Sequence, residues 1–144
     1  MNDDDLLTIT NAHNRIERIR ELGDQFIEHV AGNLVPEGIP ATLDVDNTSL
    51  RVTAFGKTLT AEPRVVRSQA DYLLEYVFEA KIGDDEIVQV ATFYLSLDGH
   101  LYSDSECENR VCDYNNRFIA KYICGNVALG AINSRLFEPS PGDA

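Results

Sequence analysis

Two long runs rich in β-branched and aromatic residues, 71–82 and 86–97, flank the tripeptide Gly83-Asp84-Asp85. Such runs around a short Gly- and Asp-containing segment are typical of a β-hairpin. Because side chains alternate between the two faces of a strand, one innermost pair, Ile82 with Ile87, fixes the rest of the register. The other predicted pairs on that face are Ala80 with Gln89, Phe78 with Ala91, Tyr76 with Phe93, Leu74 with Leu95, and Tyr72 with Leu97. This apolar face is the side expected to meet the core.

Shorter strands are expected on both sides of this hairpin. Asp98-Gly99 has the composition of a type I′ turn, so a third strand is predicted over residues 100–103, with Tyr102 on the core side opposite Leu95. Upstream, alternating apolar residues predict strands near 41–45 and 50–55, and a tight turn at 55–58 leads to a strand at 58–62. The segment 64–71 is compatible with either a strand end or a helical turn.

Amphipathic helices are predicted near both ends of the chain. In residues 8–33 apolar positions recur every three or four residues, with Thr8, Thr10 or Asn11 as candidate caps. A second helix is predicted from Asn116, capped by Asp113 or Asn115, and its expected buried stripe is Phe118, Tyr122, Gly125, Leu129, Ile132 and Leu136. Gly125 and Gly130 are interpreted as positions that permit close helix packing.

These elements predict an α+β fold in one domain of residues 1–144, with frayed tails at 1–7 and 138–144. An N-terminal amphipathic helix is followed by an antiparallel meander of about five strands and a C-terminal helix, with both helices on one sheet face. The expected centre of the core combines both helices with the hairpin: Ile19, Phe26, Tyr76, Phe78, Phe93, Leu95, Tyr122 and Leu129.

The charge of the chain narrows the possible partners. Its 144 residues hold 12 Lys and Arg against 24 Asp and Glu, a formal net charge of −12. Such a chain is repelled by nucleic acid and by anionic lipid, so direct binding to either is not expected. There is no apolar run near the roughly 20 residues that span a bilayer, and the start MNDDDLL is acidic where a signal peptide is basic. A cytoplasmic location is therefore expected.

No motif for catalysis, a cofactor or a metal stands out. Cys107, Cys112 and Cys124 lack zinc-module spacing, and a site that joins two of them to His100 is a remote alternative to three reduced thiols. The three His residues have no evident nucleophilic partner. We therefore expect a non-enzymatic protein without a cofactor or metal.

The acidic residues are concentrated in one part of the chain. Residues 71–113 hold eleven acids and two bases, which accounts for −9 of the net −12. An asymmetric negative field favours a basic partner. The expected partner-binding acids lie on the outward face of the hairpin and at its turn: Glu75, Glu79, Asp84, Asp85 and Glu86.

The same outward face is expected to carry apolar residues. By the predicted register it displays Leu73, Val77, Val88, Val90, Thr92, Tyr94 and Leu101. Apolar residues ringed by acids are typical of a protein-binding or dimer surface, although scattered Val and Tyr are also ordinary on an exposed sheet. Val77, Val88, Val90 and Tyr94 complete the predicted binding residues.

No segment matches a family signature residue by residue. In its layout of a long first helix, a twisted antiparallel sheet and a closing helix, with low pI, the chain resembles class I type III secretion chaperones. This resemblance implies an acidic cytosolic homodimer that escorts a protein client, with a middle helix in residues 64–71. The same layout is also similar to small acidic immunity and inhibitor proteins.

Three functional hypotheses follow. The preferred one is an acidic binding module that neutralises a basic or nucleic-acid-binding protein, with salt-sensitive association. The second is a chaperone-like homodimer that binds through hydrophobic strips. The third is a small-molecule-binding protein or enzyme with a pocket between helices and sheet, lined by Tyr72, Tyr76, Gln89 and Tyr102.

Overall fold

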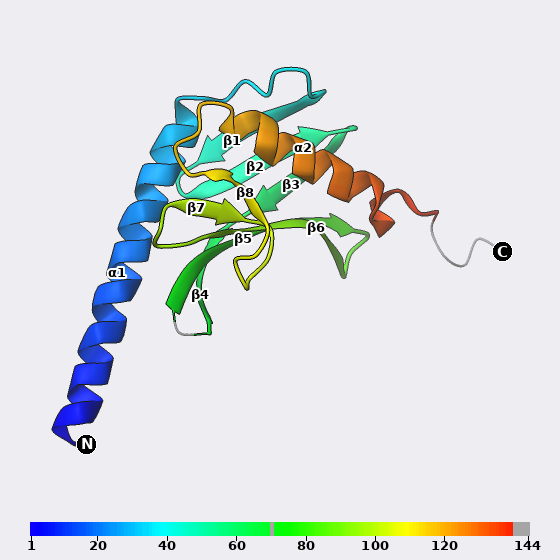
Figure 1. The fold of residues 1–144 in the computed structure, drawn as a ribbon. Coiled ribbons are helices and arrows are strands. Elements are labelled where there is room, and N and C mark those ends of the chain that lie inside the picture. Colours follow the sequence, from blue (N-terminus) through cyan, green and yellow to red (C-terminus); the bar gives the residue numbers. More distant parts are fainter. Residues whose placement is uncertain (70, 140–144) are drawn as a thin grey trace.

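The computed structural model describes residues 1–69 and 71–139. Within them a long helix, α1 (Asp3–Ala31), precedes an eight-stranded antiparallel sheet, which is followed by α2 (Ile119–Ile132) and the short 3-10 helix η1 (Arg135–Phe137). Figure 1 shows the curled sheet with α1 along one side and α2 across it. The strands are β1 (Ala41–Asp46), β2 (Ser49–Ala54), β3 (Lys57–Ala61), β4 (Pro63–Ser68), β5 (Asp71–Ile82), β6 (Glu86–Leu95), β7 (His100–Tyr102) and β8 (Arg110–Asp113). The α+β class with a helix at each end of the sheet is confirmed.

The long strand β5 organises the sheet. The strand order is β1-β2-β3-β5-β6-β7-β8, and β4 also pairs with β5. Thr60 of β3 is opposite Glu79, whereas β4 pairs with residues 71–76. Strand β4 therefore occupies residues 64–68 of the segment 64–71, and residues 32–118 contain no helix in the part of the chain that the structure describes. The middle helix implied by the chaperone resemblance is absent from that segment.

The predicted register of the central hairpin is correct over half its length. Leu74 with Leu95, Tyr76 with Phe93 and Phe78 with Ala91 pair as expected. Beyond Phe78 the register shifts by one residue, so that Ala80 is opposite Val88 and Ile82 opposite Glu86. The extra residue, Val90, makes a β-bulge, so residues 86–89, between the bulge and the hairpin turn, face the side opposite to the one predicted.

The third strand is also shifted by one residue. Leu101, not Tyr102, lies opposite Leu95 in the core, and Tyr102 pairs with Tyr94. The reason is the turn: Gly99 N–H donates to Ser96 O at 3.0 Å, and Gly99 has φ of +84°. This is the three-residue hairpin loop in which a type I turn is followed by a left-handed residue. The loop has one residue more than the predicted two-residue turn.

Helix α1 starts earlier than predicted. Asn2, not Thr8, Thr10 or Asn11, is the cap, and its side chain forms a capping box with Asp5. Residues 3–7, expected to fray, are therefore helical. The predicted tail 138–144 lies mostly outside the described residues, which end at Pro139. Neither α1 nor α2 combines the length and apolar character that a membrane span requires, as judged on the described residues.

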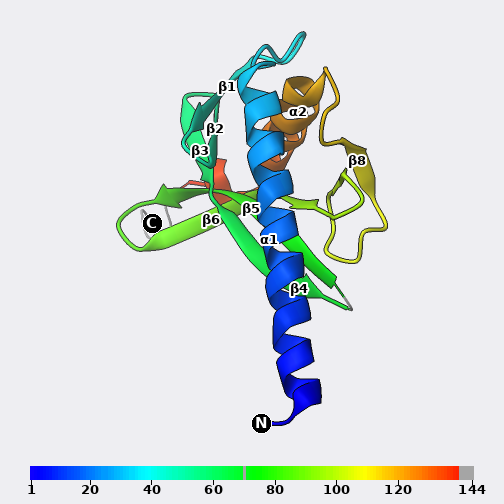
Figure 2. The same ribbon diagram turned by 90° about the vertical axis from the view of Figure 1, so that its left-hand side faces the viewer.

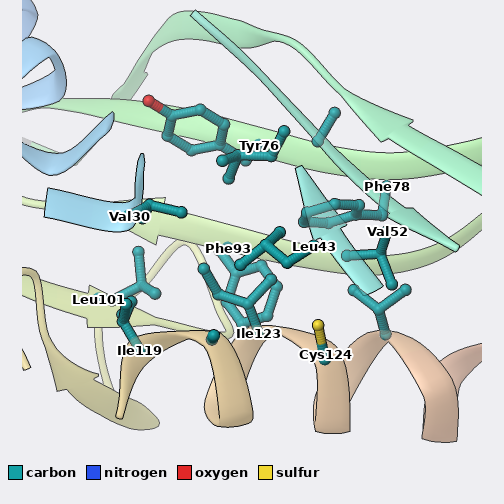
Figure 3. Packing of buried hydrophobic residues seen from close by; sticks show 14 of the residues in the cluster. Val30, Leu43, Val52, Tyr76, Phe78, Phe93, Leu101, Ile119, Ile123 and Cys124 are labelled. Atoms are coloured by element: carbon teal, nitrogen blue, oxygen red, sulfur yellow. The ribbon is translucent and has the colours of Figure 1, made fainter. Parts of the chain in front are cut away.

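Both helices pack on the same face of the sheet and share one core. Phe26 of α1 meets Tyr76 edge-on with ring centroids 5.4 Å apart, and Phe78 meets Phe93 in the same way at 5.9 Å. Figure 3 shows Ile119, Ile123 and Cys124 of α2 beneath the rings of Phe78 and Phe93. The predicted core residues on α1 and the hairpin are confirmed, but Tyr122 and Leu129 are exposed.

Helix α2 is rotated relative to the prediction. Its buried face consists of Ile119, Ala120, Ile123, Cys124, Val127, Ala128 and Ala131. Gly130 lies against the backbone of the bulge, where an added Cβ would overlap the carbonyl oxygen of Val90. The expectation that a glycine permits close packing is thus confirmed at Gly130, which rests on the sheet itself.

Candidate protein-binding surface

The outer face of the sheet, turned away from both helices, contains a hollow of about 620 Å³. The alternation that buries Tyr76 and Phe78 on the helix side places Glu75, Val77 and Glu79 of β5 in this hollow. Further residues of β5 and residues of β3, β4 and β6 with the β3–β4 connection complete the lining: Thr58, Thr60, Glu62, Pro63, Arg64, Ala80, Lys81, Ile87 and Gln89. Three of the predicted partner-binding residues therefore share one open concavity.

Five of the eleven acids in residues 71–113 are held by bonds within the chain. Two pair with arginines of the helical segments: Asp71 with Arg15 at 2.6 and 2.9 Å, and Glu86 with Arg135 of η1. Hydrogen bonds from the Arg15 guanidinium lower the pKa of Asp71. Glu86, a predicted binding residue, therefore has a counterion of its own.

The other three held acids stabilise the turns around β7. Asp104 accepts from the backbone N–H groups of Glu108 and Asn109 at 3.0 and 2.7 Å, and Asp98 accepts from Tyr102 Oη at 3.1 Å. Asp113 pairs with Arg110 and lies 2.6 Å from His100 Nδ1. Hydrogen bonds from Arg110 and His100 lower the pKa of Asp113. These carboxylates serve local structure.

Six acids remain without an ion pair among the described residues: Glu75, Glu79, Asp84, Asp85, Glu106 and Glu108. We call this set the outer acidic surface. Glu75 and Glu79 line the hollow, Asp84 and Asp85 form the exposed tip of the β5–β6 hairpin, and the last two belong to the β7–β8 loop. Arg64 and Lys81 partly offset the charge of the hollow.

Tyr94 lies where the strand acids meet the β7–β8 loop, residues 103–109. Ser68 Oγ donates to Ser105 O at 2.6 Å and ties this loop to β4. Burial, a hydrogen bond with Glu75 and the negative charges of Glu75, Glu106 and Asp104 raise the pKa of Tyr94 to about 12. A neutral phenol ringed by carboxylates suits the guanidinium or ammonium group of a partner, by charge pairing and by contact with the aromatic ring.

The apolar part of the predicted surface is smaller than expected. Val88 is only 6% exposed, and Val90 packs against the core from the bulge. Leu101 is in the core and Leu73 is buried, so their predicted outward exposure is also wrong. The register shifts account for Val88 and Leu101, because a slip of one residue sends a strand's side chains to the opposite face, whereas Leu73 keeps its predicted face and is buried there.

Most of the stripe that was predicted to be buried is exposed on α2, whereas its last residue, Leu136 of η1, is buried as predicted. Phe118, Tyr122, Leu129 and Ile132 are between 39% and 63% exposed. Their spacing places them on one side of the helix, with Gly125 between them. Sequence reasoning recognised the stripe but assigned it to the core. The small residues on the opposite face of α2 could have indicated the correct orientation, because they allow the helix to approach the sheet closely.

The residues proposed for a small-molecule pocket do not meet in one cavity. Tyr76 is buried and lines a hollow of about 270 Å³ between α1 and β4, together with Arg20, Asp24 and Thr48. Gln89 belongs to the outer hollow, and Tyr102 bonds Asp98 instead. The small-molecule hypothesis was based on a shared pocket of these side chains, and the structure does not place them in one pocket.

The cysteines are unbridged and do not gather with His100. Cys112 and Cys124 are buried, and Cys107 is partly exposed in the β7–β8 loop. Among the described residues no three His, Cys, Asp or Glu side chains are grouped in a way that could hold a metal. Burial raises the pKa of Cys112 to about 12 and that of Cys124 to about 11.

We expect these differences to appear in thiol labelling. In the native protein a disulfide reagent such as DTNB should modify Cys107 first, and slowly at neutral pH, because burial and nearby carboxylates raise its pKa and reduce the thiolate fraction. Cys112 and Cys124 should react only after unfolding. The C107S variant should lose the first phase. Two rapidly reacting native thiols, or fewer than three in denaturant, would contradict this assignment.

No protein-family model, no curated protein and no solved structure matches this chain. The functional assignment therefore depends on the geometry of the chain itself.

Proposed function

We propose that this chain is a non-enzymatic binding module that neutralises a basic protein partner in the cytosol. The outer acidic surface is the binding site, and Tyr94 and Val77 supply its apolar contacts. The partner class is an inhibitor target such as a nuclease or another nucleic-acid-binding protein, whose cationic site accepts carboxylates where it would otherwise accept phosphates.

One observation carries this proposal. Five acids of residues 71–113 are held by internal bonds, whereas the six of the outer acidic surface have no ion pair among the described residues, and of these six Glu75 shares a hydrogen bond with the Tyr94 phenol. Unpaired like charges on one part of a surface repel each other and focus a negative field outward. A basic partner relieves that repulsion and is attracted over about 8 Å at physiological ionic strength.

The proposal predicts site-specific, salt-sensitive binding of a cationic probe. A fluorescein-labelled oligolysine peptide should bind the native protein, with affinity that falls as salt rises. Glu75→Gln with Glu79→Gln should weaken binding several-fold, chiefly through slower association, because the hollow loses two of its charges. Fluorescence anisotropy and stopped-flow mixing give the affinity and the association rate.

The matched control is Glu21→Gln with Glu28→Gln. It changes the net charge by the same amount but acts on exposed residues of α1, which packs on the other face of the sheet. Equal effects of the two double variants would show that only net charge matters and would reject the outer acidic surface as a site. If Val77→Ser and Tyr94→Ser abolished binding of a native partner while the Gln variants bound normally, the hydrophobic, chaperone-like hypothesis would replace it.

A further inference from the structure

The amino-terminal half of α1 extends beyond the body of the protein. Figures 1 and 2 both show this projection. No residue before Ile19 is buried, and Leu6, Leu7 and Ile9 are each more than half exposed. We call residues 3–16 the arm.

The apolar face of the arm continues the face that α1 packs on the sheet. Ile9, Ala12 and Ile16 precede Ile19 at helical spacing, and Leu6 lies one turn before Ile9. Helices of this length are marginal in water without tertiary contacts. The capping box at Asn2 and Asp5 stabilises the first turn but buries no apolar surface. The arm is tied to β5 near its end by the Arg15–Asp71 ion pair, and Ala12 and Ile16 are half-buried, whereas Leu6 and Ile9 form an exposed apolar face.

The exposed stripe of α2 is the surface that matches the arm in size. It extends from Phe118 to Ile132, and at 1.5 Å per residue this is roughly 21 Å, close to the roughly 20 Å of the arm. Gly125, which has no side chain, leaves room at the centre of the stripe for a helix to approach. Beside its first turn is a hollow of about 540 Å³, lined by Leu34, Val35 and Phe118 among others.

Charge favours the same pairing. The arm begins with Asp3, Asp4 and Asp5, whereas residues 114–137 contain no acid and three bases, Arg117, Lys121 and Arg135. Arg117 and Lys121 line the hollow at the start of the stripe. In a chain of net charge −12, two copies repel each other over most of their surfaces. The acid-free α2 segment is where an acidic, apolar arm of a second copy meets least repulsion.

We propose that this protein forms a two-fold homodimer in which the arm of each copy lies along the α2 stripe of the other. Leu6 and Ile9 contact the Phe118–Ile132 stripe, and the aspartates of the arm lie beside Arg117 and Lys121. The contact is reciprocal, as a two-fold dimer requires. This surface is separate from the outer acidic surface, which stays open for a partner.

The experiment compares two double variants, alone and mixed. Sedimentation equilibrium of the native chain should show twice the 16.0 kDa monomer mass at micromolar concentration. Leu6→Gln with Ile9→Gln damages only the arm, and Leu129→Gln with Ile132→Gln damages only the stripe. All four side chains are exposed in the single chain, so both variants should keep the native circular dichroism. Each variant alone should be monomeric.

Mixing the two variants is the decisive step. A one-to-one mixture should recover dimers, because the stripe of the arm variant and the arm of the stripe variant are both intact and form one of the two contacts. A dimer joined stripe to stripe or arm to arm would not be recovered by mixing the two variants. A one-to-one mixture that forms no dimer would therefore overturn the proposal. A native chain that stays at 16.0 kDa throughout the concentration range would also overturn it.

Charge exchange provides a second readout. Asp3→Lys with Asp4→Lys should weaken the dimer at least tenfold, and so should Arg117→Glu with Lys121→Glu. Mixing these two variants should restore affinity, since opposite charges again face each other in one of the two contacts. Lack of any such recovery would contradict the proposed placement of the acidic end of the arm.

Discussion

Phe93→Ala should lower the free energy of unfolding by about 3 to 5 kcal/mol. The Phe93 ring is almost completely buried at the centre of the core, edge-on to Phe78 and facing Ile123 of α2 (Figure 3). Removing it leaves a cavity that the long strands β5 and β6, fixed by their hydrogen-bonded register, cannot easily close. Urea denaturation monitored by circular dichroism measures the loss.

The informative control is Tyr122→Ala. Sequence periodicity assigned Tyr122 to the same core, but its side chain is exposed on α2. Its replacement should change stability by less than about 1 kcal/mol in the monomeric Leu6→Gln, Ile9→Gln background, where no dimer contact contributes. Similar losses at Phe93 and Tyr122 would show that α2 packs in the predicted orientation and that the observed rotation of α2 is incorrect.

Gly130→Ala should lower the stability by about 2 to 3 kcal/mol, the range of an overpacked core. The added methyl group meets backbone atoms, with the carbonyl carbon of Val90 at 2.8 Å from the ideal Cβ position. Backbone at a bulge between two long strands moves less easily than a side chain. The helix must therefore lift from β6, which separates the small-residue face of α2 from the sheet.

Gly125→Ala is the matched substitution in the same helix. There the nearest atom to an added Cβ is Ile39 Cδ1 at 3.8 Å, an ordinary van der Waals contact. Alanine is a better helix former than glycine by roughly 0.5 to 1 kcal/mol, so in the monomeric Leu6→Gln, Ile9→Gln background, where no dimer contact involves Gly125, this substitution should slightly raise the stability. The prediction is thus a change of opposite sign at two glycines five residues apart. A stabilising Gly130→Ala would contradict the close contact of α2 with the bulge.

The candidate site was only partly accessible from sequence. The acidic character of residues 71–113 is a matter of composition, and Glu75, Val77 and Glu79 follow from the alternation of β5. That Asp71 pairs with Arg15, and Glu86 with Arg135, depends on helices distant in the chain. The distribution of charged residues along the sequence therefore identified the acidic region 71–113. It could not distinguish the acids that are bonded within the chain from those that are open to a partner.

Local patterns determined the α+β class, α1, the central hairpin and the pairing of Tyr76 with Phe93, because period-two and helical spacing act over a few residues. Tertiary structure decided the rest. The bulge at Val90 lies in an uninterrupted β-rich run and reverses the exposure of Val88. Helix α2 is apolar on two sides, so its sequence periodicity is compatible with burial of either side. The observed one buries the small-residue face, because only Gly130 and its small neighbours let the helix rest on the sheet, and it leaves Tyr122 and Leu129 exposed.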